Sequence, residues 1–273
     1  MAANPYTTLI DADAVAARPD AFRILDCRSR LGDPEFGPRA YAEGHLPGAL
    51  YASLDADFAA PPGAGGRHPL PDPAFLRDRF RAWGVNDGDQ IVVYDDAGGA
   101  FAARAWWCAR WLGHAAVAVL DGGLAAWRGP LSQAHPVVEP GNFSIRPALT
   151  RSIDAPALLS ALDSRVLVDA RSRARFSGAE EPIDPVAGHI PGAVCLPFQE
   201  NLGSDGRFRP AAELAARFDK LPDDVVCYCG SGVTAAHNVL AMRIAGRPEP
   251  VLYPGSWSEW LRDPGRPVAT GDG

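Results

Sequence analysis

The chain is poor in cysteine and has no excess of basic charge. Five cysteines in 273 residues are too few and too irregularly spaced for a disulfide framework or a zinc site. The formal net charge of -7 gives no basic field for nucleic acid, so local arginines must bind any anionic ligand. We therefore expect no metal, no nucleic-acid partner and a reducing, cytoplasmic location.

Long apolar runs are also missing. No segment approaches the roughly 18 apolar residues that a membrane-spanning helix needs. The first 20 residues lack the cationic start and apolar core of a signal peptide. A content of 47% hydrophobic and 22% charged residues is typical of a globular chain, and we expect no membrane partner.

An internal repeat organises the sequence. The matching segments are LDCRS (25–29) with VDARS (168–172), GHLPGA (44–49) with GHIPGA (188–193), IVVYD (91–95) with VVCYC (225–229), and GGLAAW (122–127) with GSWSEW (255–260). This duplication predicts two homologous domains, at 1–128 and 151–273. Residues 129–150 are rich in Pro and Gly and lack helical periodicity, which predicts a linker.

Each copy alternates short apolar strands with helical segments. In the second copy, strands are predicted at 165–170, 193–197, 224–229 and 250–253, and helices at 212–218 and 234–245. This order predicts an α/β fold in which helices cover both faces of a parallel sheet. Ligands bind such sheets beyond the carboxyl ends of the strands.

Cys229 stands at one of these strand ends, in the segment CGSGVTA (229–235). Free backbone N–H groups and the positive end of the following helix favour a thiolate there. Gly230 and Gly232 let the loop curl so that several N–H groups converge on the sulfur. We predict a nucleophilic cysteine in an anion-binding loop; the alternative is an ordinary core cysteine beside a turn.

The first copy has Asp95 where the second has Cys229. A carboxylate cannot act as a thiolate, so we predict a catalytically inactive first domain and one catalytic centre in the second. Cys227 precedes Cys229 by two residues, and so short a loop disfavours a disulfide between them. We expect Cys227 to be a buried spectator, with a redox role as the alternative.

The duplicated motifs, together with CGSGVTA and GSWSEW, resemble those of the two-domain rhodanese-like sulfurtransferases over about residues 9–260. The resemblance implies two tandem rhodanese-like domains and an enzyme without a cofactor. It also implies that Cys229 carries a persulfide, whose outer sulfur passes to a thiol, to cyanide or to thioredoxin.

The residues after the cysteine indicate the sulfur donor. In the family, Gly-Ser at this place accompanies 3-mercaptopyruvate as donor and Arg-Lys accompanies thiosulfate; this chain has Gly230-Ser231. A neutral loop disfavours the thiosulfate dianion. The resemblance thus implies transfer of sulfane sulfur from 3-mercaptopyruvate with release of pyruvate. The alternative is a thiosulfate sulfurtransferase using the same site.

Arg175 matches the family arginine that binds the substrate anion. Some members use a second arginine before the Gly-His motif, but this chain has EPID at 181–184, and Arg173 is the candidate replacement. Arg171 is expected to be structural, because the inactive copy keeps its counterpart. The resemblance adds substrate-binding residues in the loop: Gly230, Gly232, Val233 and Thr234.

A Ser-His-Asp proton relay is also implied by the resemblance, with Ser231, His68 and Asp55 in these roles. Such a relay would supply a proton to the pyruvate enolate as sulfur leaves. The alternative for His68 is a solvated loop histidine. Two other functional classes remain: a cysteine phosphatase, which needs an arginine where this chain has Ala235, and a non-catalytic binding module.

Overall fold

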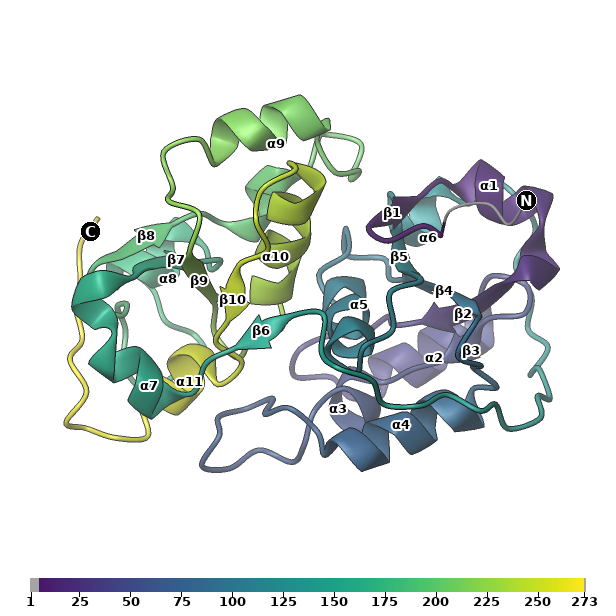
Figure 1. The fold of residues 1–273 in the computed structure, drawn as a ribbon, viewed down its shortest axis with the longest axis horizontal. Helices are drawn as coiled ribbons and strands as arrows, with labels where there is room; N and C mark the ends of the chain where they lie inside the picture. Colours follow the sequence, from purple (N-terminus) through teal and green to yellow (C-terminus); the bar gives the residue numbers. More distant parts are fainter. Residues whose placement is uncertain (1–4, 273) are drawn as a thin grey trace. The chain divides into compact units, whose positions relative to one another are not determined.

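Two compact units make up residues 5–272, which are the residues that the computed structural model describes (Figure 1). Unit 1 contains the chain up to Ala60, with Pro71–Leu149 and Ser204–Arg207. Unit 2 contains Pro61–Leu70, Thr150–Gly203 and the chain from Phe208 onward. The outer limits of the predicted domains, residues 1 and 273, lie outside the described residues.

Unit 1 is built on a five-stranded parallel sheet in the order β1-β5-β4-β2-β3. The strands are β1 (Leu9–Ile10), β2 (Phe22–Asp26), β3 (Leu50–Tyr51), β4 (Gln90–Tyr94) and β5 (Val117–Leu120). The helices are α1 (Ala12–Ala17), η1 (Pro19–Ala21), α2 (Phe36–Glu43), α3 (Leu54–Asp57), α4 (Pro73–Ala82), α5 (Ala102–Trp111) and α6 (Gly123–Ala126).

Unit 2 repeats this order strand for strand, as β6-β10-β9-β7-β8 (Figure 1). The strands are β6 (Arg151–Ser152), β7 (Val166–Asp169), β8 (Ala193–Cys195), β9 (Val225–Tyr228) and β10 (Val251–Leu252). The helices are α7 (Ala155–Ser160), η2 (Leu162–Ser164), α8 (Arg173–Ser177), η3 (Phe198–Asn201), α9 (Ala211–Arg217), α10 (Ala235–Ile244) and α11 (Ser256–Trp260). The predicted fold class is confirmed.

The central strand and the longest helix of unit 2 are buried. All four residues of β9 are buried, as expected for a parallel strand covered on both faces. In α10 the run from Ala235 to Met242 is buried as well. The loop between β9 and α10 therefore starts and ends in rigid elements. Of the helices within residues 5–272, none has the length and apolarity required to cross a membrane.

The repeated Asp-x-Arg motif joins a strand end to the Gly-His turn in both units. Arg28 lies 2.6 Å from Asp26 and donates to the Gly44 carbonyl at 2.7 Å. Arg171 forms the matching contacts with Asp169 and with the Gly188 carbonyl, both at 2.7 Å. The same contacts occur in a unit with a cysteine loop and in one without, which gives these arginines a structural role.

Candidate active site

Cys229 follows the last residue of β9 and begins the loop that leads to α10. Its side chain is buried, with 2% of the residue exposed. The backbone N–H of Gly232 donates to Sγ at 3.1 Å. The sulfur thus occupies the loop position that the sequence predicts, with a backbone hydrogen-bond donor directed at it.

The shape of this loop requires glycine at position 232. Gly232 has φ of 77°, and a Cβ there would lie 2.1 Å from the carbonyl oxygen of Pro254. The loop is also bonded to the start of α11: Trp257 donates to the Cys229 carbonyl at 3.0 Å, and Ser258 donates to the Gly230 carbonyl at 2.9 Å. These hydrogen bonds fix the backbone conformation at Cys229 and Gly230.

Ser256 is a site residue that the sequence analysis missed. Its Oγ accepts a hydrogen bond from the N–H of Cys229 at 3.1 Å and donates to the Tyr253 carbonyl at 2.9 Å. Among residues 5–272 it is the sole non-glycine residue with positive φ, at 55°. The signal in the sequence was a serine in GSWSEW where the first copy has Gly123. Left-handed backbone costs about 1–2 kcal/mol here, which the two hydrogen bonds offset.

The structure brings His68 and Ser231 together although 163 positions separate them in the sequence. Nδ1 of His68 lies 2.7 Å from Oγ of Ser231, and both residues belong to unit 2. Ser231 is buried and His68 is half-buried. A fully solvated loop histidine would not make this contact. Asp55 belongs to unit 1, where it lies exposed in the first turn of α3.

Arg175, in α8, is held by two buried carboxylates from the EPID segment. Its Nε and Nη2 donate to Glu181 at 2.8–3.1 Å, and Nη2 lies 3.0 Å from Asp184. Asp184 also forms an ion pair with Arg67. Both arginines lie next to Gly230: a Cβ at that position would be 2.7 Å from Nη2 of Arg67 and 3.4 Å from Nη1 of Arg175.

Arg67 is the second residue near the cysteine loop that the sequence analysis missed. Arg173, the candidate replacement for the missing family arginine, lies elsewhere. The Arg173 side chain is 65% exposed and pairs with Glu200 at 3.1 Å. The expectation that Arg173 replaces the missing arginine is therefore wrong in this structure. Its position in the first turn of α8 directs it to η3, whereas Arg67 reaches Asp184.

Burial and ion pairing act in opposite directions on the two acids. Burial favours a raised pKa for Glu181, but hydrogen bonds from Arg175 and from the backbone N–H groups of Asp184 and Ile183 outweigh it and lower the pKa. Burial raises the pKa of Asp184, with Arg67 opposing the change. Glu181 is thus the firmly ionised partner that orients Arg175.

The other four cysteines are held as neutral thiols. Burial raises the pKa of Cys27, Cys108, Cys195 and Cys227, to about 11 for Cys195. All of them are buried and free, and Cys227 forms no disulfide. A thiol that stays protonated at neutral pH is a poor nucleophile.

In unit 1 the loop that follows β4 has a carboxylate in place of the sulfur. Asp95 is fully buried and accepts four backbone N–H hydrogen bonds at 2.8–2.9 Å. The donors are the N–H groups of Ala97, Gly99, Phe101 and Ala102. This loop is therefore an anion-binding loop whose anion is part of the chain.

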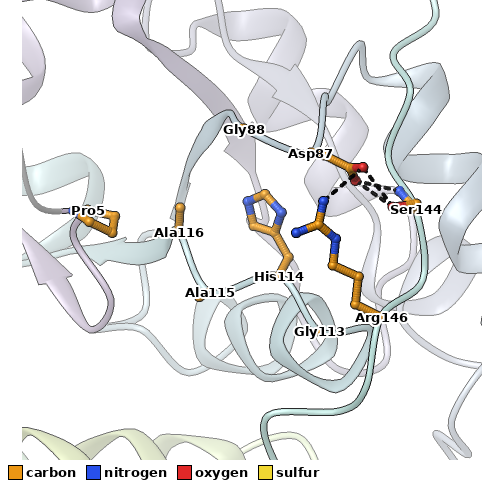
Figure 2. A pocket seen from close by; sticks show the side chains of 9 residues that line it. All are labelled: Pro5, Asp87, Gly88, Gly113, His114, Ala115, Ala116, Ser144 and Arg146. Atoms are coloured by element: carbon orange, nitrogen blue, oxygen red, sulfur yellow. Dashed lines mark hydrogen bonds and ion pairs between the residues drawn. The ribbon is translucent and has the colours of Figure 1, made fainter. Parts of the chain in front are cut away.

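A pocket in unit 1 lies beside Gly88 and Ala116, which precede β4 and β5 (Figure 2). Figure 2 shows Arg146 and Ser144 directed at Asp87, with an Arg146–Asp87 distance of 3.1 Å. The charged groups of this pocket pair with each other. The pocket also lies at the amino ends of the strands, opposite to the end where such sheets bind ligands.

A family profile described as "Rhodanese-like domain" matches residues 10–130 and again residues 154–263. The chain belongs to the rhodanese-like family, and the resemblance inferred from the repeats is confirmed.

Relatives and solved structures extend this similarity over nearly the whole chain. The chain is 52% identical to a Pseudomonas aeruginosa protein named "Probable 3-mercaptopyruvate sulfurtransferase", over 97% of this chain and 98% of that one. It is 34% identical to the thiosulfate sulfurtransferase of Mus musculus, over 89% and 86% of the two chains. The structure of the 3-mercaptopyruvate sulfurtransferase from Leishmania major superposes with a TM-score of 0.85 at 30% identity, covering 95% of this chain and 75% of that one.

Proposed function

We propose that the protein is a sulfurtransferase that takes sulfane sulfur from 3-mercaptopyruvate, holds it as a persulfide on Cys229 and passes it to a thiol or to cyanide. The observation that carries the proposal is the donation from the Gly232 N–H to Sγ of Cys229 at 3.1 Å, in a loop bordered by the Ser231–His68 pair and by Arg175. The names of the relatives support the same reaction class.

In the first step the Cys229 thiolate attacks the sulfur of 3-mercaptopyruvate. An S–S bond forms, the C–S bond breaks, and its electron pair stays on carbon as the enolate of pyruvate. Ser231, hydrogen-bonded to His68 at 2.7 Å, supplies the proton that converts this enolate to pyruvate. Asp55 is proposed as the third residue of the relay, as the family resemblance implies.

Arg175 and the loop that begins at Cys229 bind the substrate. Arg175 binds the carboxylate through its guanidinium group, whose opposite edge Glu181 holds at 2.8–3.1 Å. N–H groups of Gly230, Gly232, Val233 and Thr234 stabilise negative charge on the two sulfurs.

In the second step the acceptor attacks the outer sulfur of the persulfide, and the Cys229 thiolate returns. The acceptor is cyanide, a small thiol or reduced thioredoxin. Five free cysteines suit a reducing, cytoplasmic location. We assign catalysis to the domain at 151–273 and regard 1–128, joined by the linker 129–150, as inactive because Asp95 occupies its loop.

Thiosulfate is the second candidate donor. The guanidinium groups of Arg67 and Arg175 both lie within 3.4 Å of a Cβ position at Gly230, so cationic groups stand near a loop that is itself neutral. A dianion gains from such charges.

The test compares kcat/KM for 3-mercaptopyruvate and thiosulfate, with cyanide as the common acceptor. A preference of about tenfold or more for 3-mercaptopyruvate, equivalent to about 1.4 kcal/mol in transition-state binding, supports the proposal. A preference for thiosulfate replaces the donor and leaves the persulfide chemistry in place. In parallel, Cys229 should gain about 32 Da on exposure to donor and lose it to a thiol; a protein that never gains this mass is not a sulfurtransferase.

A further inference from the structure

Arg67 occupies a position that no sequence motif assigns to the active site. It lies in Pro61–Leu70, between α3 and α4 in sequence, yet this segment packs in unit 2. Within this segment, a turn from Gly63 to Gly66 directly precedes Arg67 and is closed by two backbone hydrogen bonds at 3.0 and 3.1 Å. Gly66 has φ of 97°, and a Cβ there would lie 2.6 Å from Oγ of Ser258. Glycine at this position lets the segment contact α11.

The backbone of Arg67 is fixed from two directions. Its N–H donates to Oγ of Ser258 at 3.0 Å, and Ser258 in turn donates its own N–H to the Gly230 carbonyl at 2.9 Å. The next residue, His68, contacts Ser231 at 2.7 Å. Arg67 is therefore tied through short hydrogen-bonded links to the loop that carries Cys229.

The guanidinium groups of Arg67 and Arg175 share one carboxylate and face one surface. Asp184 binds Arg67 with Oδ1 and Arg175 with Oδ2, the latter at 3.0 Å. The carboxylate is 3% exposed, whereas the arginine side chains are 24% and 15% exposed. The acid thus lies behind the two arginines and holds them side by side at the loop.

Both arginines keep donors available on the loop side. Within residues 5–272, Nη2 of Arg67 and Nη1 of Arg175 have no hydrogen-bond acceptor. These two nitrogens lie 2.7 and 3.4 Å from a Cβ position at Gly230, the residue next to Cys229. A substrate with a carboxylate and an adjacent carbonyl presents acceptor oxygens that two such guanidinium edges can bind.

Resting on the proposed function, we infer that Arg67 is a substrate-binding residue that forms, with Arg175, a two-arginine clamp for the α-keto carboxylate of the donor. It supplies the second guanidinium that the EPID segment lacks. The same segment instead supplies Asp184, the acid that holds the clamp together. The clamp selects for α-keto acids over sulfur donors without a carboxylate.

The experiment measures KM and kcat for 3-mercaptopyruvate and for mercaptoacetone, in which a methyl group replaces the carboxylate. Arg67→Gln should raise KM for 3-mercaptopyruvate by about 10- to 100-fold, the loss expected for a charged hydrogen bond, with kcat within about threefold. For mercaptoacetone KM should change by less than about twofold. Arg67→Lys should lie between, because lysine keeps the charge without the planar fork.

Arg173→Gln is the matched control, since it removes an exposed arginine of the same unit that pairs with Glu200. It should leave both KM values at those of the unaltered protein. A KM for Arg67→Gln equal to that control overturns the clamp. So does an equal rise in KM for both substrates, because Arg67 would then act by positioning His68 or the loop. If Arg67→Gln fails to fold, the same comparison is made with Arg67→Lys: its rise in KM for 3-mercaptopyruvate is compared with its rise in KM for mercaptoacetone.

Binding of pyruvate separates this inference from the proposed function. In the Cys229→Ser protein, calorimetry with pyruvate should show about tenfold weaker binding when Arg67 is also replaced by Gln. Arg67-dependent pyruvate binding without any turnover of 3-mercaptopyruvate would remove the proposed reaction and retain the clamp. Turnover with Arg67-independent pyruvate binding would remove the clamp and retain the reaction.

Discussion

The loops that follow β4 and β9 occupy equivalent places in the two sheets, but they begin with different residues, Asp95 in unit 1 and Cys229 in unit 2. In unit 1 the Asp95 carboxylate accepts four N–H hydrogen bonds and fills its own loop. In unit 2 the corresponding residue, Cys229, takes one N–H, from Gly232 at 3.1 Å. Within the described residues, the carboxylate at this position accepts four backbone N–H groups and the thiol accepts one, so equivalent loops in the two units bind different side chains.

The charged groups around the two loops also differ. Beside the cysteine loop, Asp184 and Glu181 hold Arg67 and Arg175, so two guanidinium groups lie next to Gly230. The aspartate loop carries its negative charge within the loop itself. The loop of unit 1 thus contains a buried carboxylate, whereas the loop of unit 2 has two arginines beside it.

The largest effect should follow from Cys229→Ser. Pyruvate release should fall by about four orders of magnitude or more, because the hydroxyl is a far weaker nucleophile and cannot form a persulfide. Single-turnover assays with 3-mercaptopyruvate measure this loss. Cys195→Ser, which alters a buried thiol with a pKa raised to about 11, should retain activity within about twofold. Substantial pyruvate release from Cys229→Ser would contradict the assignment of the nucleophile.

Asp95→Ala should destabilise unit 1 by about 3–5 kcal/mol, because four buried N–H groups lose a charged acceptor. Cys229→Ala should cost unit 2 less than about 1.5 kcal/mol, since one N–H loses a weak acceptor. Urea denaturation and amide hydrogen exchange at residues 97–102 measure the difference. Equal losses of unfolding free energy for Asp95→Ala and Cys229→Ala would contradict the proposed difference between the two loops.

Glu181→Gln should reduce the free energy of unfolding by about 1–3 kcal/mol at neutral pH. The pKa of Glu181 is lowered in the folded chain, so its stabilisation is present above the ordinary carboxyl pKa and is lost as pH falls through the folded value. The difference between the two proteins should therefore shrink below about pH 4 in urea titrations. Glu213→Gln, which alters an exposed pair with Arg209, should change stability by less than about 0.5 kcal/mol. A difference that grows toward acid pH would contradict this cause.

The smallest effect is expected for Ser256→Gly. Relief of the φ of 55° should nearly cancel the loss of the hydrogen bond to Cys229, leaving stability within about 1 kcal/mol. The reverse exchange, Gly123→Ser, should cost more than about 2 kcal/mol, because a Cβ there would lie 2.2 Å from the Asp95 carbonyl oxygen. Thermal unfolding of both variants measures the asymmetry. Similar costs for the two would show that the backbones of the loops are interchangeable.

Much of the fold followed from local patterns. The apolar run at 224–229 and the helical segment 234–245 correspond to β9 and α10, and they place Cys229 at the strand end. The contact of His68 with Ser231 was expected from family resemblance alone. Arg67 was not foreseen, since nothing in the sequence links residues 66–71, which contain Arg67, to Asp184. Arg173 was a wrong candidate because its side chain pairs with Glu200.

The sequence by itself determined the duplication, the α/β alternation and the position of Cys229 at a strand end, because strand runs, turn glycines and repeats are local patterns with a direct physical meaning. Tertiary structure decided which charged groups lie near the Cys229 loop. The pairing of Arg67 with Asp184 joins residues 117 positions apart and depends on Gly66 fitting against α11. Such long-range contacts arise from packing, which local patterns do not encode.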